Sequence, residues 1–320
     1  MKIFNTLDEI RIEEKTAVAL GNFDGIHVGH DVILRDALEQ AKKLGLKSLC
    51  YTFSNHPFNF IMGREETDPT ALKQICSEED KIRMLEGMGF DYLVNVPFDE
   101  VTMKMCAHDF FENVLMGSLN ASSVSVGFNY TYGARAEGKA ADLVRDGEDN
   151  GITVCVHDAV VLDDKVISST LIRGLIAAGD MELTAKYLGR PYSFTGIVEH
   201  GRRVGGKLGF PTINLKAPAN RALPPNGVYY SRILIDGTIY PAVSNIGVKP
   251  TFDDAYVQTG KTIETHVFDY DGDAYDCEVT VYFDRFGREE MRFKSSEDLH
   301  AQIEKDCEAA RDFHLNREKN

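Results

Sequence analysis

The chain has 320 residues, of which 43% are hydrophobic and 27% charged, and this is the composition of a folded globular protein of about two domains. Its 35 basic and 50 acidic residues give a net charge of −15. That excess of acid argues against a nucleic-acid binder, which needs a basic face.

The chain begins with residues too acidic for a signal peptide, and no apolar run is long enough to cross a bilayer. The six cysteines are scattered without a CxxC pair, which suits a reducing compartment better than a zinc site or a disulfide framework. We therefore expect a cytoplasmic protein with no membrane partner.

The first half of the chain alternates strand-like and helix-like segments. Short apolar runs predict strands at 16–20, 48–53, 91–96, 122–126 and 152–156. A helix is predicted at 28–43, and another opens on acidic residues at Ser77 and ends near Gly87 or Gly89. This alternation predicts an α/β, Rossmann-like domain whose parallel sheet has helices on both faces and binds ligands at the carboxyl ends of its strands.

The pattern changes near residues 188–191, after which short alternating strands are joined by turns. Asp236-Gly237 and Asp271-Gly272 both have the sequence of two-residue hairpin turns, and helical periodicity returns after Arg288. We predict a small antiparallel β-barrel with a C-terminal helix. The predicted domains are residues 1–187 and 188–320.

A glycine-rich segment, residues 21–30, lies where the first strand passes into the first helix. Its three glycines allow close approach of a ligand, and the free N–H groups at the helix start favour phosphate. His27 and His30 are one helical turn apart, so both imidazoles can face phosphate oxygens. A tight turn carrying two surface histidines explains the pattern equally well, whereas a zinc site lacks a third ligand.

A second segment, residues 167–173, places three hydroxyls and an arginine at the start of another helix. Such hydroxyls cap a helix or bind phosphate, and Arg173 carries a permanent charge. By itself, Ser-Ser-Thr is more often a cap alone.

Together the two segments resemble the nucleotidylyltransferase superfamily, whose HxGH signature and downstream serine-rich signature hold one ATP. The form GNFDGIHVGH with ISSTLIR resembles the FMN adenylyltransferase module of bacterial FAD synthetases, and residues 52–57, 127–133 and 188–191 fit the same family. The resemblance implies that the FMN phosphate attacks the α-phosphorus of ATP in line and that pyrophosphate leaves.

The resemblance also implies roles for individual residues of the first domain. Two histidines are implied to be catalytic: His27 and His30. Nucleotide contacts are implied for Gly21, Asn22, Phe23, Asp24, Gly29, Ser168, Ser169, Thr170 and Arg173. Flavin contacts are implied for His56, Pro57 and Asn129. Tyr130 and Tyr132 can stack on a ring, although they need no function as core aromatics.

Residues 201–207 match the first seven positions of a P-loop, but Leu208 replaces the required hydroxyl, and we reject that interpretation. Residues 205–214 instead resemble the signature of riboflavin kinases, with Ile213 in place of the usual alanine. The resemblance implies nucleotide contacts at Gly205, Lys207 and Gly209. Thr212 and Asn214, two residues apart on a strand, face the same way and offer oxygen ligands for the Mg²⁺ on ATP. Gly206 stands where an arginine is common.

Strand alternation places Glu264 and His266 on one face of a strand. A carboxylate there can accept the proton of an attacking hydroxyl, but a solvent-facing glutamate on a barrel strand has the same pattern. The match of residues 263–269 to the Glu-x-His-x-Phe-Asp segment of riboflavin kinases implies that Glu264 is the catalytic base. The same resemblance, which includes residues 245–252 and 288–293, implies a flavin contact at Arg288.

The two resemblances imply a bifunctional riboflavin kinase/FMN adenylyltransferase. Its substrates would be riboflavin, FMN and ATP, with Mg²⁺ as cofactor, in a monomer or weak homo-oligomer. Three alternatives remain open: an enzyme with one live half, a flavin-binding regulator that kept the fold without the chemistry, and a single-function transferase for another small substrate. The retained histidines, hydroxyls, Arg173 and Glu264 argue against a regulator.

Overall fold

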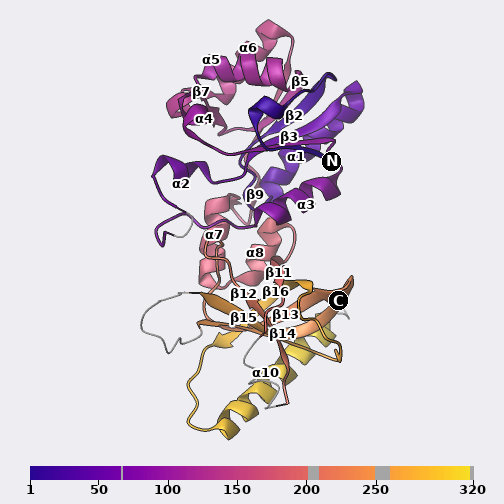
Figure 1. Cartoon of the computed structure of the whole chain (residues 1–320), viewed down its shortest axis with the longest axis vertical. Coiled ribbons are helices and arrows are strands. Elements are labelled where there is room, and N and C mark those ends of the chain that lie inside the picture. Colours follow the sequence, from indigo (N-terminus) through magenta and orange to yellow (C-terminus); the bar gives the residue numbers. More distant parts are fainter. Residues whose placement is uncertain (66–67, 201–208, 249–259, 318–320) are drawn as a thin grey trace. The chain divides into compact units, whose positions relative to one another are not determined.

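The computed structural model describes residues 1–65, 68–200, 209–248 and 260–317. Contacts divide the chain into two compact units, Met1–Ser169 and Thr170–Asn320 (Figure 1).

The first unit is built on a six-stranded parallel sheet in the order β1-β4-β3-β2-β5-β8. All five predicted strands of this sheet are present, each within one residue of its expected bounds. The short edge strand β1 was not predicted, because three residues cannot display an alternating pattern. The strands are β1 (Lys2–Phe4), β2 (Thr16–Leu20), β3 (Lys47–Phe53), β4 (Tyr92–Val96), β5 (Ala121–Gly127) and β8 (Thr153–His157).

Helices cover both faces of this sheet, as predicted. Helices α1 (Val28–Leu44) and α3 (Glu78–Met88) pack on one face, and η2 (Phe110–Ser118) and α6 (Ala140–Asn150) on the other. Ser77 caps α3 and Gly89 ends it in a left-handed conformation, which confirms both predicted ends. The shorter elements of the unit are η1 (Leu7–Glu9), α2 (Pro57–Ile61), α4 (Glu100–Lys104), α5 (Ala107–Asp109), η3 (Ala134–Ala136), β6 (Thr131–Tyr132), β7 (Gly138–Lys139), β9 (Val161–Leu162) and β10 (Lys165–Val166).

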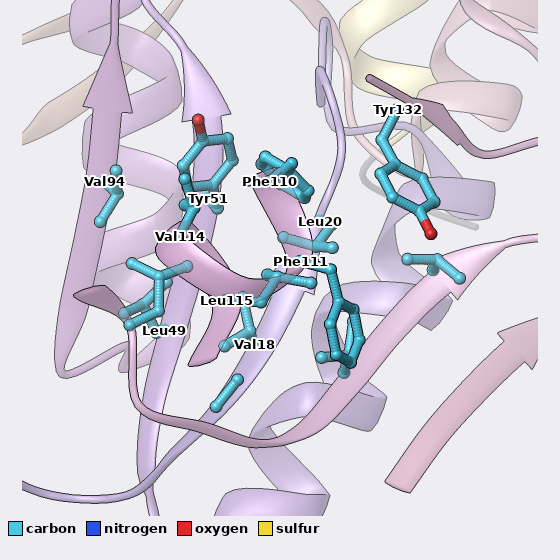
Figure 2. Packing of buried hydrophobic residues seen from close by; sticks show 14 of the residues in the cluster. Val18, Leu20, Leu49, Tyr51, Val94, Phe110, Phe111, Val114, Leu115 and Tyr132 are labelled. Atoms are coloured by element: carbon cyan, nitrogen blue, oxygen red, sulfur yellow. The ribbon is translucent and has the colours of Figure 1, made fainter. Parts of the chain in front are cut away.

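Successive residues of the central strands supply two hydrophobic cores. In β2, Val18 and Leu20 face the aromatic cluster around Phe110 on η2 (Figure 2), whereas Ala19 faces Leu34 of α1. Burial on both faces is what a parallel sheet requires, and it fixes the ends of β2, β3 and β5 beneath the loops that carry the sequence motifs.

The second unit is a curled antiparallel sheet of six strands, a half-barrel in the order β11-β16-β13-β14-β15-β12. An isolated bridge between Glu199 and Asn214 links the segment after β11 to the opposite edge strand. The predicted C-terminal helix is present, and helices α7 and α8 precede the sheet. The elements are α7 (Ser169–Ala178), α8 (Met181–Leu188), β11 (Tyr192–Ile197), β12 (Thr212–Lys216), β13 (Gly227–Ile235), β14 (Thr238–Val248), β15 (Lys261–Val267), β16 (Glu278–Glu289) and α10 (Ser296–Arg317).

One of the two predicted hairpins is confirmed and the other is wrong. Asp236 and Gly237 both have positive φ and join β13 to β14, with Ile235 paired to Thr238. Asp271-Gly272 instead lies in the long connection between β15 and β16, which do not pair with each other. Neither residue has positive φ, so the dipeptide forms no primed turn.

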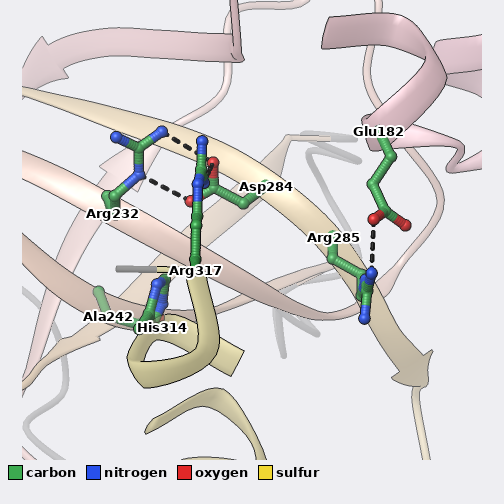
Figure 3. A network of polar contacts seen from close by, with 7 residues as sticks. All are labelled: Glu182, Arg232, Ala242, Asp284, Arg285, His314 and Arg317. Atoms are coloured by element: carbon green, nitrogen blue, oxygen red, sulfur yellow. Dashed lines mark hydrogen bonds and ion pairs between the residues drawn. The ribbon is translucent and has the colours of Figure 1, made fainter. Parts of the chain in front are cut away.

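Charged side chains fasten α10 to the half-barrel (Figure 3). Asp284 of β16 is buried and accepts two hydrogen bonds from Arg232, at 2.8 and 2.9 Å, and a further one from Arg317 at the end of α10. His314 is also buried, with its Nε2 3.3 Å from the carbonyl oxygen of Ala242. Removing one partner from such a buried group is costly, so this end of α10 is firmly held.

Among the described residues, no helix is both long and apolar enough to cross a membrane.

Candidate active sites

The glycine-rich segment forms a strained turn between β2 and α1. Phe23, Gly25 and Ile26 have φ values of 47°, 84° and 37°. Positive φ is rare for a β-branched residue such as Ile26, and backbone strain of this kind concentrates at functional sites. Gly21 is needed for close packing, because a Cβ there would lie 2.8 Å from the ring of Phe23.

The two histidines lie together, as their spacing predicts. Their rings stack with centroids 3.6 Å apart at an interplanar angle of 17°. His27 also has a role that the sequence analysis did not foresee. Its Nδ1 accepts hydrogen bonds from the backbone N–H groups of Gly29 and His30, both at 3.2 Å, and so caps α1. The ring of the buried His27 therefore keeps a lone pair on Nδ1 and its proton on Nε2.

The second motif segment meets the first within the same unit. The Ser169 hydroxyl donates to the backbone carbonyl of Asp24 at 3.0 Å, and the carbonyl oxygen of Ile167 lies 3.8 Å from the position of a Cβ on Gly29. The Asp24 carboxylate accepts from the backbone N–H of Ile75 at 2.9 Å. Asp24 thus anchors the loop before α3 in addition to any contact with nucleotide.

Three other predicted nucleotide contacts are placed less closely by these bonds. Ser168 lies just before α7, and Thr170 and Arg173 lie further along that helix in the second unit. Their part in a nucleotide site stays a prediction.

A cavity of about 510 Å³ opens beside the glycine-rich segment. Its size suits a flavin-sized ligand, and its wall combines aromatic rings with a few polar groups, which is the usual make-up of a ligand site. The predicted residues that line it are Gly21, Asn22, Phe23, His30, His56, Pro57, Asn129, Tyr130 and Tyr132. Pro57 occupies the first turn of α2, where His56 accepts from the N–H of Phe58 at 3.2 Å.

Tyrosines of this cavity are unsuited to proton transfer. Burial raises the pKa of Tyr132 to about 12, and burial likewise holds the pKa of Tyr51 and Tyr130 well above the ordinary tyrosine value. The rings of Tyr130 and Tyr132 stack on each other with centroids 6.0 Å apart. Both residues therefore serve as neutral aromatic wall.

In the second unit, strand register gathers the predicted kinase residues. Glu264 of β15 pairs with Asn214 of β12 on one side and with Asn245 of β14 on the other. Residues paired across strands share a face, so the carboxylate lies between two amides. Thr212 pairs with His266 two residues along, on the same face.

The predicted metal ligands are held by short-range bonds. The amide of Asn214 donates to the carbonyl of Thr212 at 3.2 Å. The Nδ1 of His266 is 2.9 Å from the carbonyl oxygen of Pro211, so it donates there and fixes the residue before Thr212. Burial lowers the pKa of His266 below its usual value, which keeps the ring neutral. The hydroxyl and amide oxygens of Thr212 and Asn214 fit a hard cation such as Mg²⁺.

A cavity of about 850 Å³ lies over this face of the half-barrel. Thr212, Glu264, His266 and Arg288 line it together with apolar side chains, among them Phe293. Arg288 is already paired here: its Nε and Nη2 donate to the two carboxylate oxygens of Asp306 on α10, at 2.9 and 2.5 Å. The structure therefore brings the predicted flavin contact to the cavity and gives it a partner that the sequence analysis missed.

A second cavity in this unit, of about 380 Å³, also includes Thr212 in its wall. Val198 and Ile213 line it, along with the loop after β15 that contains Tyr270 and Tyr275. The sequence analysis did not identify this cavity, because the loop carries no motif by which it was recognised. Gly209 is described and has φ of 84°, whereas Gly205, Gly206 and Lys207 lie outside the described residues.

A Rossmann-like sheet with a strained glycine-rich first loop, followed by an antiparallel half-barrel with its own cavities, defines a two-unit transferase of the nucleotide-dependent class. Comparison with known families agrees with this. The FAD synthetase family model matches residues 9–171, and the riboflavin kinase model matches residues 188–314.

Curated relatives match along nearly the whole chain. A bifunctional riboflavin kinase/FMN adenylyltransferase of Bacillus subtilis is 34% identical over 93% of this chain and 92% of its own length. The relative of the same description from Pseudomonas fluorescens is 35% identical over 97% of both chains. The chain belongs to the bifunctional riboflavin kinase/FMN adenylyltransferase family. It is an enzyme with a nucleotidyltransferase domain and a kinase domain of FMN and FAD synthesis, and ATP is its co-substrate.

A solved structure has the same fold. A crystal structure from Streptococcus pneumoniae, described as a macrolide-efflux protein, superposes with a TM-score of 0.85 at 29% identity and covers 97% of this chain and 98% of its own. That description concerns the Streptococcus protein, and the similarity shows that the whole two-unit arrangement of elements recurs.

Proposed function

We propose that the residues identified above carry the two reactions at two separate sites. The 850 Å³ cavity would phosphorylate riboflavin to FMN, and the 510 Å³ cavity would adenylylate FMN to FAD. The observation that supports this most strongly is the segregation of the motif residues: the flavin-binding set of each reaction lines a different cavity in a different unit.

In the kinase reaction, Glu264 accepts the proton of the ribityl 5′-hydroxyl. The oxygen attacks the γ-phosphorus of ATP, and ADP leaves. The apolar wall of the 850 Å³ cavity suits the isoalloxazine ring, while the 380 Å³ cavity takes the nucleotide. Thr212 borders both cavities, which is where the transferred phosphoryl group must pass. The pair of amides around Glu264 orients its carboxylate toward the hydroxyl.

In this reaction Mg²⁺ would neutralise charge on the ATP phosphates. Thr212 and Asn214 would hold it, together with phosphate oxygens, because Mg²⁺ in nucleotide sites is usually held by few protein groups. Among the described residues, no three His, Cys, Asp or Glu side chains are grouped to hold a metal by themselves. Gly205, Lys207 and Gly209 would contact the nucleotide.

In the adenylylation, the FMN phosphate attacks the α-phosphorus of ATP and pyrophosphate departs. A phosphate is already a competent nucleophile, so positioning and charge neutralisation suffice. His27 and His30 would stabilise the triphosphate, with Ser168, Ser169, Thr170 and Arg173 from the second segment. His56, Pro57 and Asn129 would hold the flavin.

We place the functional boundary at residue 188, where the riboflavin kinase match begins. The contact division falls earlier, at Ser169, since α8 packs on β11 and β16 of the second unit. We further propose that the enzyme acts in the cytoplasm, where ATP is available and scattered cysteines stay reduced.

The test is incubation of the purified full-length protein with riboflavin, ATP and Mg²⁺, with products separated over time. We expect FMN first and FAD later. FMN as the final product, or FAD formed only from supplied FMN, would contradict the two-site proposal by showing one active half. Absence of both products would favour a flavin-binding protein without catalysis.

A further inference from the structure

Lys81 is a buried lysine in the wall of the first unit. It lies on the face of α3 that packs against the sheet, next to the buried Leu85, and only 6% of its surface is exposed. Lysine is almost never this buried unless it is paired with an opposite charge. Among the described residues, however, the recorded acceptors of the Lys81 ammonium are the carbonyl oxygen of Phe53 at 2.6 Å and the hydroxyl of Thr52 at 3.5 Å. Neither acceptor is a carboxylate.

Packing alone does not account for this ammonium. A hydrophobic side chain of similar volume is often at least as stabilising as a buried charge, because the charge loses its hydration. Carboxylates stand nearby on the wall of a very small cavity that Lys81 also lines, but each has another donor. Glu78 accepts from the amide of Asn95, and Asp24 accepts from the N–H of Ile75. The lysine is therefore directed at the end of β3.

Both acceptors of Lys81 lead to the proposed flavin cavity. Phe53 is the last residue of β3 and lines the 510 Å³ cavity. Thr52 passes the contact on, because its hydroxyl donates to the carbonyl of Asn22 at 3.0 Å. Asn22 lies in the strained glycine-rich segment and lines the same cavity. One ammonium thus ties α3 to two wall residues on neighbouring strands.

We propose that Lys81 is a positioning residue for adenylyl transfer. It fixes the end of β3 and, through Thr52, the Asn22 segment, and so sets the wall against which FMN and ATP are aligned. The inference rests on the adenylylation proposed above for the first unit. A displacement of about 1 Å at a reacting group can cost on the order of 10²-fold in rate, so a brace at this place has a measurable effect.

The test compares Lys81→Met, Thr52→Val and their double variant in the full-length protein. Each is assayed for FAD formation from supplied FMN and for riboflavin phosphorylation. Lys47→Met is the matched control: Lys47 begins the same strand, is exposed, and pairs with Asp91 at 2.9 Å. Wild-type protein that makes no FAD from FMN would refute the proposed function itself, independently of Lys81.

We expect Lys81→Met to raise the KM for FMN about tenfold or more and Thr52→Val to raise it less. The double variant should raise it by less than the product of the two, since both act on one contact chain. Riboflavin phosphorylation and the Lys47→Met enzyme should be unaffected. A merely structural lysine would lower the amount of active enzyme, and therefore kcat, at unchanged KM.

An unchanged KM for FMN in Lys81→Met, or a double variant equal to the product of the singles, would overturn the proposal. If Lys81→Met does not fold, Thr52→Val is compared with Thr52→Ser, which keeps the hydroxyl. Equal KM values for those two variants would then overturn it, and a raised KM in Thr52→Val alone would support it.

Discussion

Glu264 of β15 is paired in register with Asn214 of β12. A predicted base and a predicted metal ligand are thus neighbours on one sheet face, although 50 residues separate them in the chain. Pairing on the other side with Asn245 confines the carboxylate further. Because neighbouring amides can hydrogen-bond either a carboxylate or a carboxamide, replacing Glu264 by glutamine should remove the base with little change in structure.

The pair between Arg288 and Asp306 connects β16 to α10 at the edge of the 850 Å³ cavity. Asp306→Asn should raise the KM for riboflavin several-fold, because the guanidinium would lose its charged partner and its fixed position. The second unit should also lose roughly 1–3 kcal/mol of stability, as expected for a largely buried group left under-satisfied. Steady-state kinetics and denaturant unfolding measure the two effects. Glu304→Gln, an exposed neighbour on α10 that pairs with His300, is the control and should change neither.

His266 donates to the carbonyl of Pro211 and so steadies the strand start that presents Thr212. His266→Ala should raise the KM for ATP in the kinase reaction about fivefold, the equivalent of one ordinary hydrogen bond. His266→Asn should recover most of this loss, because its amide can replace the Nδ1 donor. Equal KM values for ATP in the two variants would show that the bond to Pro211 plays no part.

Acid should destabilise the second unit through two histidines. Burial lowers the pKa of both His266 and His314, so the unfolded chain binds more protons than the folded unit below the ordinary histidine value of about 6.5. Stability is therefore present at pH 7 and falls as the pH drops through about 6.5 toward 5. His314 faces Asp284, Arg232 and Arg317, whereas His266 faces Arg311 and Asp269.

Urea unfolding of the second unit between pH 7.5 and 5 measures this dependence, and His314→Gln should flatten it. Asp36 and Asp91 of the first unit do not interfere, because their lowered pKa values act below about pH 4. A stability that rises on acidification over this range would contradict the assignment.

Gly206 stands where related kinase sequences commonly have arginine, and it lies outside the described residues. If the missing arginine matters, Gly206→Arg should tighten ATP binding at the kinase site by on the order of 1.5–3 kcal/mol, the value of one charge-assisted hydrogen bond. The KM for ATP in riboflavin phosphorylation reports it. An unchanged value would mean that Lys207 or Arg203 already supplies the charge, or that none is needed.

The sequence predicted the elements that carry strong periodicity and the residues that carry motifs. The central strands of the first unit, the ends of α3 and the hairpin at Asp236-Gly237 follow from local chemistry. Asp271-Gly272 misled, because a turn dipeptide also suits a long loop whose flanking strands pair elsewhere. Contacts distant in sequence were not predictable from a single chain: the Arg288–Asp306 pair, and Lys81 at the end of β3, depend on how helices pack.

The capping role of His27 was hidden for a different reason. Histidine is not among the residues usually expected at an N-cap, so its spacing to His30 suggested phosphate contact alone. The structure shows that one ring nitrogen is used by the helix, which leaves the other side of the ring for a ligand.

The central claim is that two reactions occur at two independent sites, and paired single substitutions test it most directly. Glu264→Gln should reduce riboflavin phosphorylation about 10²–10⁴-fold, the usual cost of losing a general base, and leave conversion of supplied FMN to FAD nearly intact. His30→Ala should reduce FAD formation about 10²–10³-fold, so that FMN accumulates from riboflavin. Measuring both activities in both folded variants is therefore decisive. Equal loss of both activities in Glu264→Gln would contradict the two-site account, and no loss in either variant would contradict the catalytic assignments.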